Sequence, residues 1–454
     1  MRGRIEERGI KRERFFGKLM RKAPNSTKPA VVLISALGFL CVFHFASPST
    51  PQAPQNEEII SVALTPSLAA RLHPLGLDYL FEWEGRTYIL VSPDEIRRLA
   101  QAGVPYLLES DKFPALRPGA SLLQGGINGE YHSYSELEAA LIDLANAYPD
   151  ITHLSTIGLS LENRKILALK ISDNAAQDEN EVEVLFTGCH HAREWISVEV
   201  PLLLAGYLLE NYASDPRVRH AVDQAETWIV PLVNPDGLEY SIRHYRYWRK
   251  NRRLNADGSF GVDLNRNYGY AWGYDDSGSS PEPASDVYRG ASPFSEPETR
   301  AVRDLFEQRD FRALVSFHSF SQVILYPWGY ANIPTGRDAR DGAIASAMSS
   351  LMRGVNGRVY EYGASSASLY LTNGDTTDWA FGVAGIPAYT IELPPVDELG
   401  GGFFNAESDI QPIFRENLPA ALYLIDWAIQ DFGAAPASNK APLLPTSSHQ
   451  GRRK

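Results

Sequence analysis

Two histidines and a glutamate have the residue types and part of the spacing of a metal site. His191 and Glu194 stand three residues apart within GCHHAREW, residues 188–195, so on a turn their side chains can face one point. His318 stands in a separate run, SFHS. Two histidines and one carboxylate leave a fourth position for water, which is how catalytic zinc is bound. Alone, the His-x-x-Glu spacing also fits an ordinary surface turn, and the chain has no HExxH pattern.

Further polar motifs along the chain could surround such a metal. They are YWRKNR at residues 247–252, GVDLNRN at 261–267, Tyr370 ahead of Asp378-Trp379, and TIEL at 390–393. Glu392 in the last motif ends an apolar strand, where a carboxylate is costly unless it has a purpose. The basic run could be a solvated face instead. The net charge of −12 argues against a nucleic-acid patch.

Together, and in this order from Tyr131 to Phe432, these motifs resemble the zinc metallocarboxypeptidases of the carboxypeptidase A/B type. The resemblance implies an exopeptidase that binds one Zn²⁺ per chain. It would hydrolyse the C-terminal peptide bond of peptides and proteins with a zinc-activated water. The metal ligands that it implies are His191, Glu194 and His318.

The same resemblance implies roles for other positions in the site. Glu392 would be the general base, and Arg249 would stabilise the oxyanion. The substrate's terminal carboxylate would be bound by Asn265, Arg266 and the mobile Tyr370, with Arg193 and Arg246 as secondary contacts. Two other functions stay open: an amidase on the same scaffold, and a binding protein with a decayed site. The residues that address a free carboxylate favour the carboxypeptidase, because arginine matches a carboxylate with two parallel bonds.

The loop between Tyr370 and Trp379 should line the pocket for the departing side chain. Thr377 is neither the aliphatic residue that goes with apolar substrates nor the Asp that goes with basic ones. Asp375 could point into the pocket and meet a Lys or Arg side chain. Similar patterns occur in bacterial carboxypeptidases of mixed specificity, so we expect cleavage after both classes. Alternatively, Asp375 only caps its own loop.

The elements expected around these motifs alternate between apolar strands and helices. Continuous apolar strands between helices predict an α/β fold, a three-layer sandwich with a mixed, largely parallel central sheet flanked by helices. The predicted strands are 182–187, 227–233, 313–317, 323–326 and 388–393. The predicted helices are 135–147, 197–211, 297–306, 343–355 and 412–431. Residues 295–298 should form a capping box for the third of these helices.

A small α+β unit should precede this domain. Residues 59–64 and 80–91 have strand character, with a break at Glu84-Gly85, and residues 67–72 and 93–102 have helical character. Ser92 before Pro93 predicts a helix N-terminus. This unit, residues 59–116, could be a pro-segment or a permanent accessory domain. Linkers at 48–58 and 117–130 should flank it. The catalytic domain should span 131–432, followed by a disordered tail at 433–454.

The N-terminus predicts export from the cytoplasm. A basic leader, residues 1–29, precedes a run at 30–47 without Asp, Glu, Lys or Arg, which is close to the length that spans a bilayer. The run could be an uncleaved signal anchor or a signal peptide, and the poor match of His44-Phe45-Ala46 to a cleavage site favours the anchor. We therefore expect an extracytoplasmic monomer, membrane-anchored or secreted. With Cys41 and Cys189 alone, no disulfide framework is expected.

Overall fold

The computed structural model describes residues 58–63, 68, 71–72, 75, 77–83, 86–109, 128–396 and 401–434. The basic leader, the apolar run at 30–47, most of both linkers and the tail from residue 435 lie outside the described residues. Within the described ranges, no helix combines the length and the apolar content needed to cross a bilayer.

The larger of two sheets has eight strands in the order β11-β10-β12-β9-β7-β8-β6-β5. Its central strands β12, β9, β7 and β8 run parallel to one another, whereas β5, β6 and β10 join antiparallel to their inner neighbours and β11 pairs parallel with β10. The strands are β5 Thr152–Leu159, β6 Lys165–Ile171, β7 Val182–Gly188, β8 Ala225–Val230, β9 Phe311–Ser319, β10 Val323–Tyr326, β11 Glu361–Ala364 and β12 Ala388–Leu393. The predicted α/β fold with a mixed sheet is confirmed.

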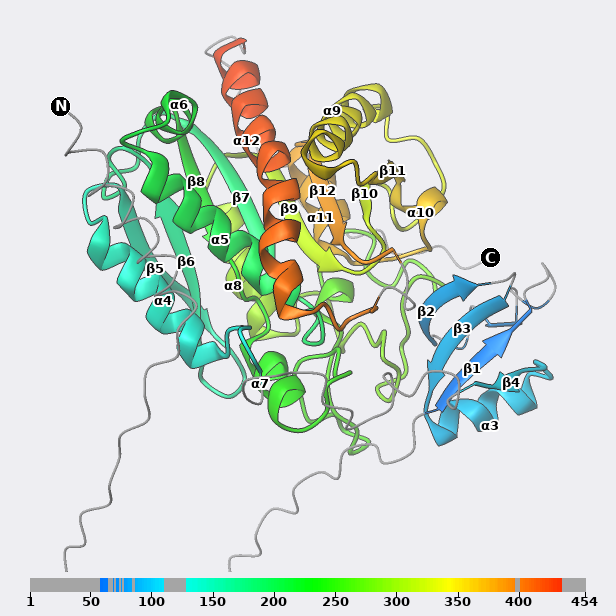
Figure 1. Cartoon of the computed structure of the whole chain (residues 1–454). Coiled ribbons are helices and arrows are strands. Elements are labelled where there is room, and N and C mark those ends of the chain that lie inside the picture. The colour runs from blue at the N-terminus through cyan, green and yellow to red at the C-terminus, as the bar shows by residue number, and fades with distance from the viewer. Residues whose placement is uncertain are drawn as a thin grey trace, which may run out of the picture. The chain divides into compact units, whose positions relative to one another are not determined.

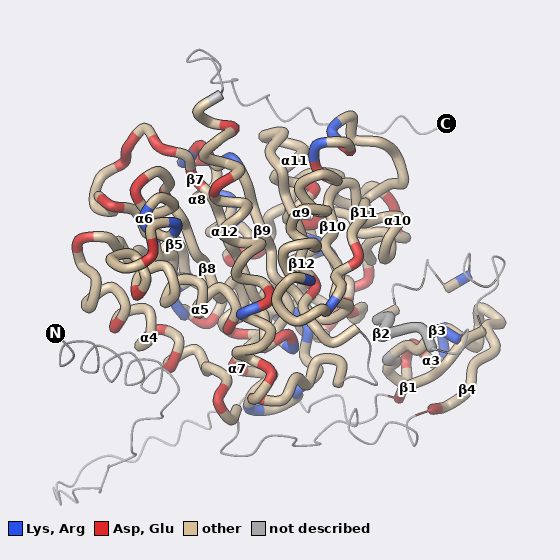
Figure 2. The backbone as a smooth tube through the Cα atoms, turned by 45° about the horizontal axis from the view of Figure 1, so that its top comes forward, with Lys and Arg blue, Asp and Glu red and all other residues tan. Residues whose placement is uncertain are grey.

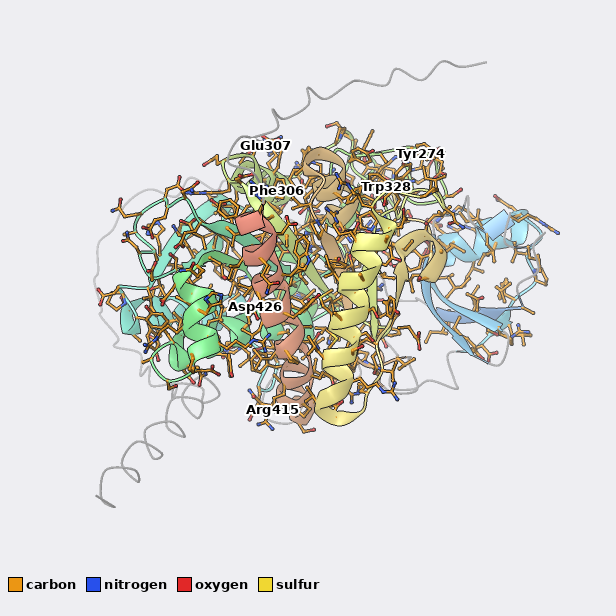
Figure 3. The ribbon with its side chains drawn as sticks, turned by 90° about the horizontal axis from the view of Figure 1, so that it is seen from above. Tyr274, Phe306, Glu307, Trp328, Arg415 and Asp426 are labelled. Atoms are coloured by element: carbon orange, nitrogen blue, oxygen red, sulfur yellow. The ribbon has the colours of Figure 1, made fainter. Side chains whose placement is uncertain are left out.

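Helices cover both faces of this sheet (Figure 1). On one face lie α5 (Ile196–Asn211) and α12 (Ile410–Ala434), and α12 packs side by side with α9 (Asp338–Asn356), as Figure 3 shows from above. On the other face lie α8 (Pro297–Glu307) and α11 (Thr376–Ala384). The remaining helices are α4 Tyr134–Ala147, α6 Pro216–Asp223, α7 Pro235–Arg243 and α10 Ser365–Ser368, with short 3₁₀ turns η3 at Leu264–Arg266 and η5 at Glu407–Asp409.

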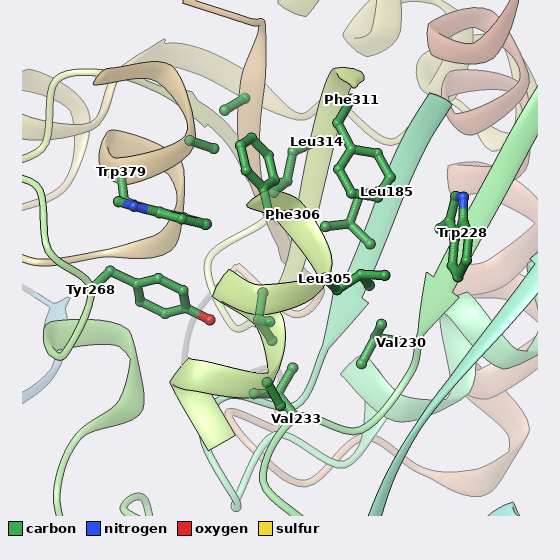
Figure 4. Close-up of a cluster of buried hydrophobic side chains, with 14 of the residues drawn as sticks. Leu185, Trp228, Val230, Val233, Tyr268, Leu305, Phe306, Phe311, Leu314 and Trp379 are labelled. Atoms are coloured by element: carbon green, nitrogen blue, oxygen red, sulfur yellow. The ribbon is translucent and has the colours of Figure 1, made fainter. Parts of the chain in front are cut away.

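A buried aromatic and aliphatic cluster fills the space between the sheet and α8 and α11 (Figure 4). Leu185 and Leu314 from adjacent strands face Leu305 and Phe306 of α8 there. Trp379 of α11 packs on Phe306 with ring centroids 4.7 Å apart. Alternate residues of the same strands, Phe186 and Phe317, are also fully buried and stack on each other. Strands that are buried on both faces have a continuous apolar sequence, and this pattern is what predicts them.

The start of α8 differs from the prediction. The N-cap is Glu296 and makes no side-chain capping bond, so the capping box expected at residues 295–298 does not form. Pro297 occupies the first helical position, which puts Glu298 one place too early to close the box. Glu296 and Glu298 are buried instead and accept hydrogen bonds from Asn251 Nδ2, at 2.8 and 3.2 Å. The two acids therefore hold the basic segment 247–252 against α8.

The smaller sheet has four antiparallel strands in the order β2-β3-β1-β4. They are β1 Glu58–Val62, β2 Asp78–Trp83, β3 Arg86–Val91 and β4 Leu107–Leu108, and α3 Pro93–Gln101 lies between β3 and β4 in the chain. Ser92 is the N-cap of α3, as predicted, and it also forms a complete capping box with Glu95. Ile60, Ile89 and Leu99 form its core with five other buried residues. This unit is the predicted small α+β unit.

Candidate active site

The predicted metal ligands lie at the carboxyl ends of the parallel strands, where α/β sheets commonly bind ligands. His191 and Glu194 occupy the tight turn between β7 and α5, and His318 lies near the end of β9. Glu392 of β12 stands in register with His318 of the neighbouring strand. The turn needs glycine at 188, since a Cβ there would lie 2.1 Å from the Ser197 carbonyl oxygen.

Three side chains of this turn and strand bring their possible metal-binding atoms together. His191 Nδ1 lies 2.7 Å from Glu194 Oε1, and His318 Nδ1 lies 3.1 Å from His191 Nδ1 and 3.0 Å from Glu194 Oε2. All three side chains are at least 95% buried. Tetrahedral zinc with ligands at about 2.0–2.1 Å separates its ligand atoms by roughly 3.3 Å, close to these distances. Two imidazole nitrogens facing each other beside a carboxylate are the donor set that zinc takes, so the residues fit the metal.

A carboxylate that the sequence reasoning did not single out supports the first ligand. Asp263 Oδ1 lies 3.2 Å from His191 Nε2, and Asp263 Oδ2 accepts from Arg249 Nε at 3.0 Å. Although burial alone would raise the pKa of Asp263, Arg249 and His191 hold it well below its ordinary value. A charged carboxylate behind a metal-binding imidazole fixes its orientation and increases its basicity. The sequence does carry a signal for Asp263, because it lies in the same GVDLNRN motif as Asn265 and Arg266.

His190 and Ser316 support the other ligand. Ser316 Oγ lies 3.0 Å from His318 Nε2 and 3.3 Å from His190 Nδ1. The His190 ring stacks on the His318 ring at 5.5 Å, and its Nε2 lies 2.8 Å from the Tyr268 hydroxyl. Burial and the adjacent histidines lower the pKa of His190 well below its ordinary value. Both ring nitrogens of His190 therefore have protein partners, which supports a packing role rather than a fourth metal ligand.

Glu392 is 8% exposed, and its Oε2 atom has no hydrogen-bond partner among the described residues. Burial raises the pKa of Glu392 to about 8, opposed by the charge of His318. A dication bound beside it would oppose the same shift, because it favours the charged carboxylate. The carboxylate thus has an unused acceptor atom next to the proposed metal ligands, where a proton-transferring group would have to lie.

The structure also describes the surroundings of Arg249, Arg266 and Asn265. Arg249 and Arg266 are 5% and 2% exposed, and the charge of each opposes the rise in the pKa of Glu392. The Arg266 guanidinium lies 6.0 Å from the ring centroid of Tyr370, and its Nε has no hydrogen-bond partner among the described residues. Asn265 Oδ1 accepts from the amide and the hydroxyl of Thr376, at 3.0 and 2.8 Å, which ties η3 to the start of α11.

Two predicted substrate contacts have protein partners. Arg246 donates to the carbonyls of Arg193 and Phe403, the second at 2.6 Å, and its guanidinium lies 3.8 Å from the Trp195 ring centroid. The guanidinium of Arg193 lies 4.1 Å from the Phe403 ring centroid. These contacts link the segment around Phe403 to the turn that carries His191 and Glu194.

Asp375 is the N-cap of α11. Its Oδ1 accepts from the Asp378 amide at 2.8 Å and from the Thr377 hydroxyl at 2.9 Å, and its Oδ2 accepts from the Thr372 hydroxyl at 2.6 Å. Burial and the Asp375 charge raise the pKa of Asp378 well above its ordinary value. These contacts match the alternative in which Asp375 caps its own loop.

Comparison with known proteins agrees with this geometry. Residues 137–420, more than half of the chain, match the family described as Zinc carboxypeptidase. The chain belongs to the zinc carboxypeptidase family. It is therefore a metallocarboxypeptidase, an exopeptidase whose family uses one catalytic zinc, and its substrates are peptides with a free C-terminus.

Individual relatives support the assignment. The chain is 34% identical over 393 residues to a zinc carboxypeptidase from Saccharothrix mutabilis subsp. capreolus, covering 82% of this chain and 89% of the relative. It is 35% identical over 292 residues to carboxypeptidase B from Astacus astacus, covering 63% and 93%. The crystal structure of carboxypeptidase A from Helicoverpa armigera is similar with a TM-score of 0.69 at 26% identity, covering 85% of this chain and 99% of that one.

Proposed function

We propose that Glu392 is the general base of this carboxypeptidase and that Arg249 stabilises the oxyanion. The observation that carries the proposal is the buried Glu392 Oε2, which has no hydrogen-bond partner among the described residues and belongs to a residue in register with a proposed metal ligand. Bound zinc lowers the pKa of water and polarises the scissile carbonyl. Glu392 accepts the proton of the attacking water and delivers it to the departing amine. Arg249, held by Asp263, offsets the negative charge that develops on the carbonyl oxygen.

The terminal carboxylate of the substrate is bound by Asn265, Arg266 and Tyr370 in this proposal. Arg266 lies beside Tyr370 and close enough to Glu392 to affect its pKa, so a C-terminal residue held there would present its peptide bond to the base. Arg193 and Arg246 contribute by holding the surrounding turn, given their contacts with Phe403.

We also propose broad specificity, with cleavage after apolar and basic residues. Thr377 brings no charge to the pocket. Asp375 is 4% exposed, and its oxygens accept hydrogen bonds from Thr372, Thr377 and the Asp378 amide. A Lys or Arg side chain would therefore be favoured by the charge of Asp375 across the pocket rather than by a direct bond, and the selectivity should be modest.

We propose that the protein is a monomer and that its catalytic domain lies outside the cytoplasm. The basic leader and the apolar run at residues 30–47 would export the catalytic domain, anchored in or released from the membrane. Protection of the domain from added protease in intact cells would contradict this location.

We propose that residues 59–116 form a pro-segment that restrains activity, on the basis of their position between the export signal and the catalytic domain. Full-length protein should then be less active than protein beginning near Gly125. Equal activity would instead support a permanent accessory domain.

One assay tests the central proposal. The zinc-loaded protein is incubated with a peptide that has a free C-terminus and with the same peptide amidated at its C-terminus. We expect release of the terminal residue from the first peptide only. Equal cleavage of both peptides would favour an amidase that ignores the carboxylate, and no cleavage of either would contradict the proposed machinery.

A further inference from the structure

A second cluster of metal-ligating side chains lies at the opposite ends of the same parallel strands. Glu183 and Glu226 are the second residues of β7 and β8 and stand in register with each other. Asp178 comes from the loop that leads into β7. Each of the three offers an oxygen atom, and these atoms all lie within 4.8 Å of one another. Like charges opposed directly across adjacent strands repel, so the arrangement needs a compensating group.

Two of these carboxylates are deeply buried and incompletely bonded. Glu183 is 5% exposed, and its side chain has neither a hydrogen bond nor an ion-pair contact with the described residues. Glu226 is fully buried, and its Oε2 also has no hydrogen-bond partner in the described part of the chain. Burial, with the neighbouring Glu226 carboxylate, raises the pKa of Glu183 to about 8. A buried carboxylate without a partner is expensive, and a bound cation would remove the cost.

The protein's own cations compensate the cluster in part. Lys170 Nζ lies 2.6 Å from Glu226 Oε1, and Arg309 Nη1 lies 3.2 Å from Asp178 Oδ1. Lys170 thus contacts the other oxygen of Glu226, and Arg309 contacts Asp178. Among the described residues, no cation forms an ion pair with Glu183. The adjoining loop adds a second acidic group, Asp173, Glu179 and Glu181. Figure 2 shows acidic positions gathered around α6 and the neighbouring loops. The region therefore keeps an excess of negative charge.

We propose that Asp178, Glu183 and Glu226 form a binding site for Ca²⁺. The donor set is oxygen only, which suits a hard cation and not zinc, whose protein sites use nitrogen and sulfur as well. Ca²⁺ accepts six to eight oxygens in irregular geometry, and a cluster on a loop and two strand ends provides such a surround. Mg²⁺ demands nearly octahedral geometry and keeps its waters, so it suits two buried carboxylates less well.

Bound Ca²⁺ would join the loop of residues 172–181 to the first residues of β7 and β8. Glu179 already donates its amide to Glu226 Oε1 at 3.1 Å, so the loop lies against the cluster without the ion. The site is separated from the catalytic centre by the length of the strands. Its occupancy should therefore act on stability and leave peptide hydrolysis at 25 °C unchanged.

The test is thermal unfolding of the zinc-loaded full chain, with zinc held constant and Ca²⁺ added to protein freed of calcium with a calcium-selective chelator. At a hundredfold excess over Kd, Tm should rise by about 4 °C. Glu183→Gln should lose this Ca²⁺-dependent rise while staying folded without Ca²⁺, because the substitution removes a charge and no bond. Asp178→Asn, from the exposed side of the cluster, is a second variant with the same expectation.

The matched control is Glu361→Gln, an exposed acid on the edge strand β11 of the same sheet. It should keep the full rise in Tm. A wild-type Tm that does not respond to 10 mM Ca²⁺ would overturn the proposal, as would an unchanged response in both Glu183→Gln and Asp178→Asn. An equal rise with Mg²⁺ would overturn the assignment to Ca²⁺.

Discussion

Glu392 and Glu183 are buried carboxylates at opposite ends of one sheet, and they share several properties. Burial raises the pKa of each to about 8, and each has an Oε2 atom without a hydrogen-bond partner in the described structure. Their surroundings differ. Glu392 lies next to His318 and is affected by the charges of Arg249 and Arg266, residues that we propose to serve metal and substrate, whereas Glu183 lies beside the carboxylates of Asp178 and Glu226. A perturbed pKa thus marks a site, and the neighbouring donor atoms decide which chemistry the site performs.

The largest effect should come from removing a metal ligand at the catalytic end. His318→Ala deletes one of three converging donors, so we expect zinc content and release of C-terminal residues to fall to background. Chelation of the wild type should have the same result, with recovery on adding Zn²⁺. The exposed His220→Ala on α6 is the control. Full activity of His318→Ala would place the zinc elsewhere.

The next effect compares the two glutamates directly. Glu392→Gln and Glu183→Gln are the same isosteric change at opposite ends of the sheet. Loss of a general base costs about 10²–10⁴ in rate. We therefore expect Glu392→Gln to bind zinc and substrate but to turn over at least about a hundredfold more slowly. More than about a tenth of the wild-type rate in Glu392→Gln would remove Glu392 from the proton transfer.

A smaller effect should follow from the carboxylate behind the first ligand. Asp263→Asn keeps the cap on the Asn265 amide and removes the charge 3.2 Å from His191 Nε2. Loss of such a partner typically weakens metal affinity by 10–100-fold. Zinc competition against a chelator measures this loss, and saturating zinc should restore much of the activity. An unchanged zinc affinity would mean that Asp263 serves only to hold Arg249.

The central sheet could be predicted from the sequence, and so could the candidate metal ligands' position at the ends of its strands. Strands buried on both faces must be continuously apolar, and a polar residue that ends such a strand is easily noticed. β10 and β12 have the predicted bounds. The antiparallel β5–β6 pair was missed, because β5 is half-exposed and lacks a continuous apolar run. Helix α11 was also missed, since its start depends on Asp375 as a cap within a loop-like stretch.

Contacts between distant segments could not be predicted from the sequence. Asp263 contacts His191 although the two residues are 72 positions apart in the chain, and neither motif predicts this contact. Glu183 and Glu226 become neighbours through strand register, which the strand patterns alone do not determine. The capping box at residues 295–298 failed for a related reason, since Glu296 and Glu298 bond to Asn251 from another segment.

The smallest effect concerns Asp375, a third buried carboxylate, which differs from both Glu183 and Glu392. Unlike Glu183, it is fully bonded, and unlike Glu392, it has no unused oxygen. Asp375→Asn keeps an oxygen that can accept from the Asp378 amide, so the cap of α11 should survive while the charge is lost. If that charge attracts a basic side chain in the pocket, kcat/KM for a C-terminal Arg should fall about tenfold, or about 1.4 kcal/mol. Cleavage after a C-terminal Leu should be spared. Equal losses on both peptides would show that Asp375 acts only on the loop, and the mixed specificity would then need another source.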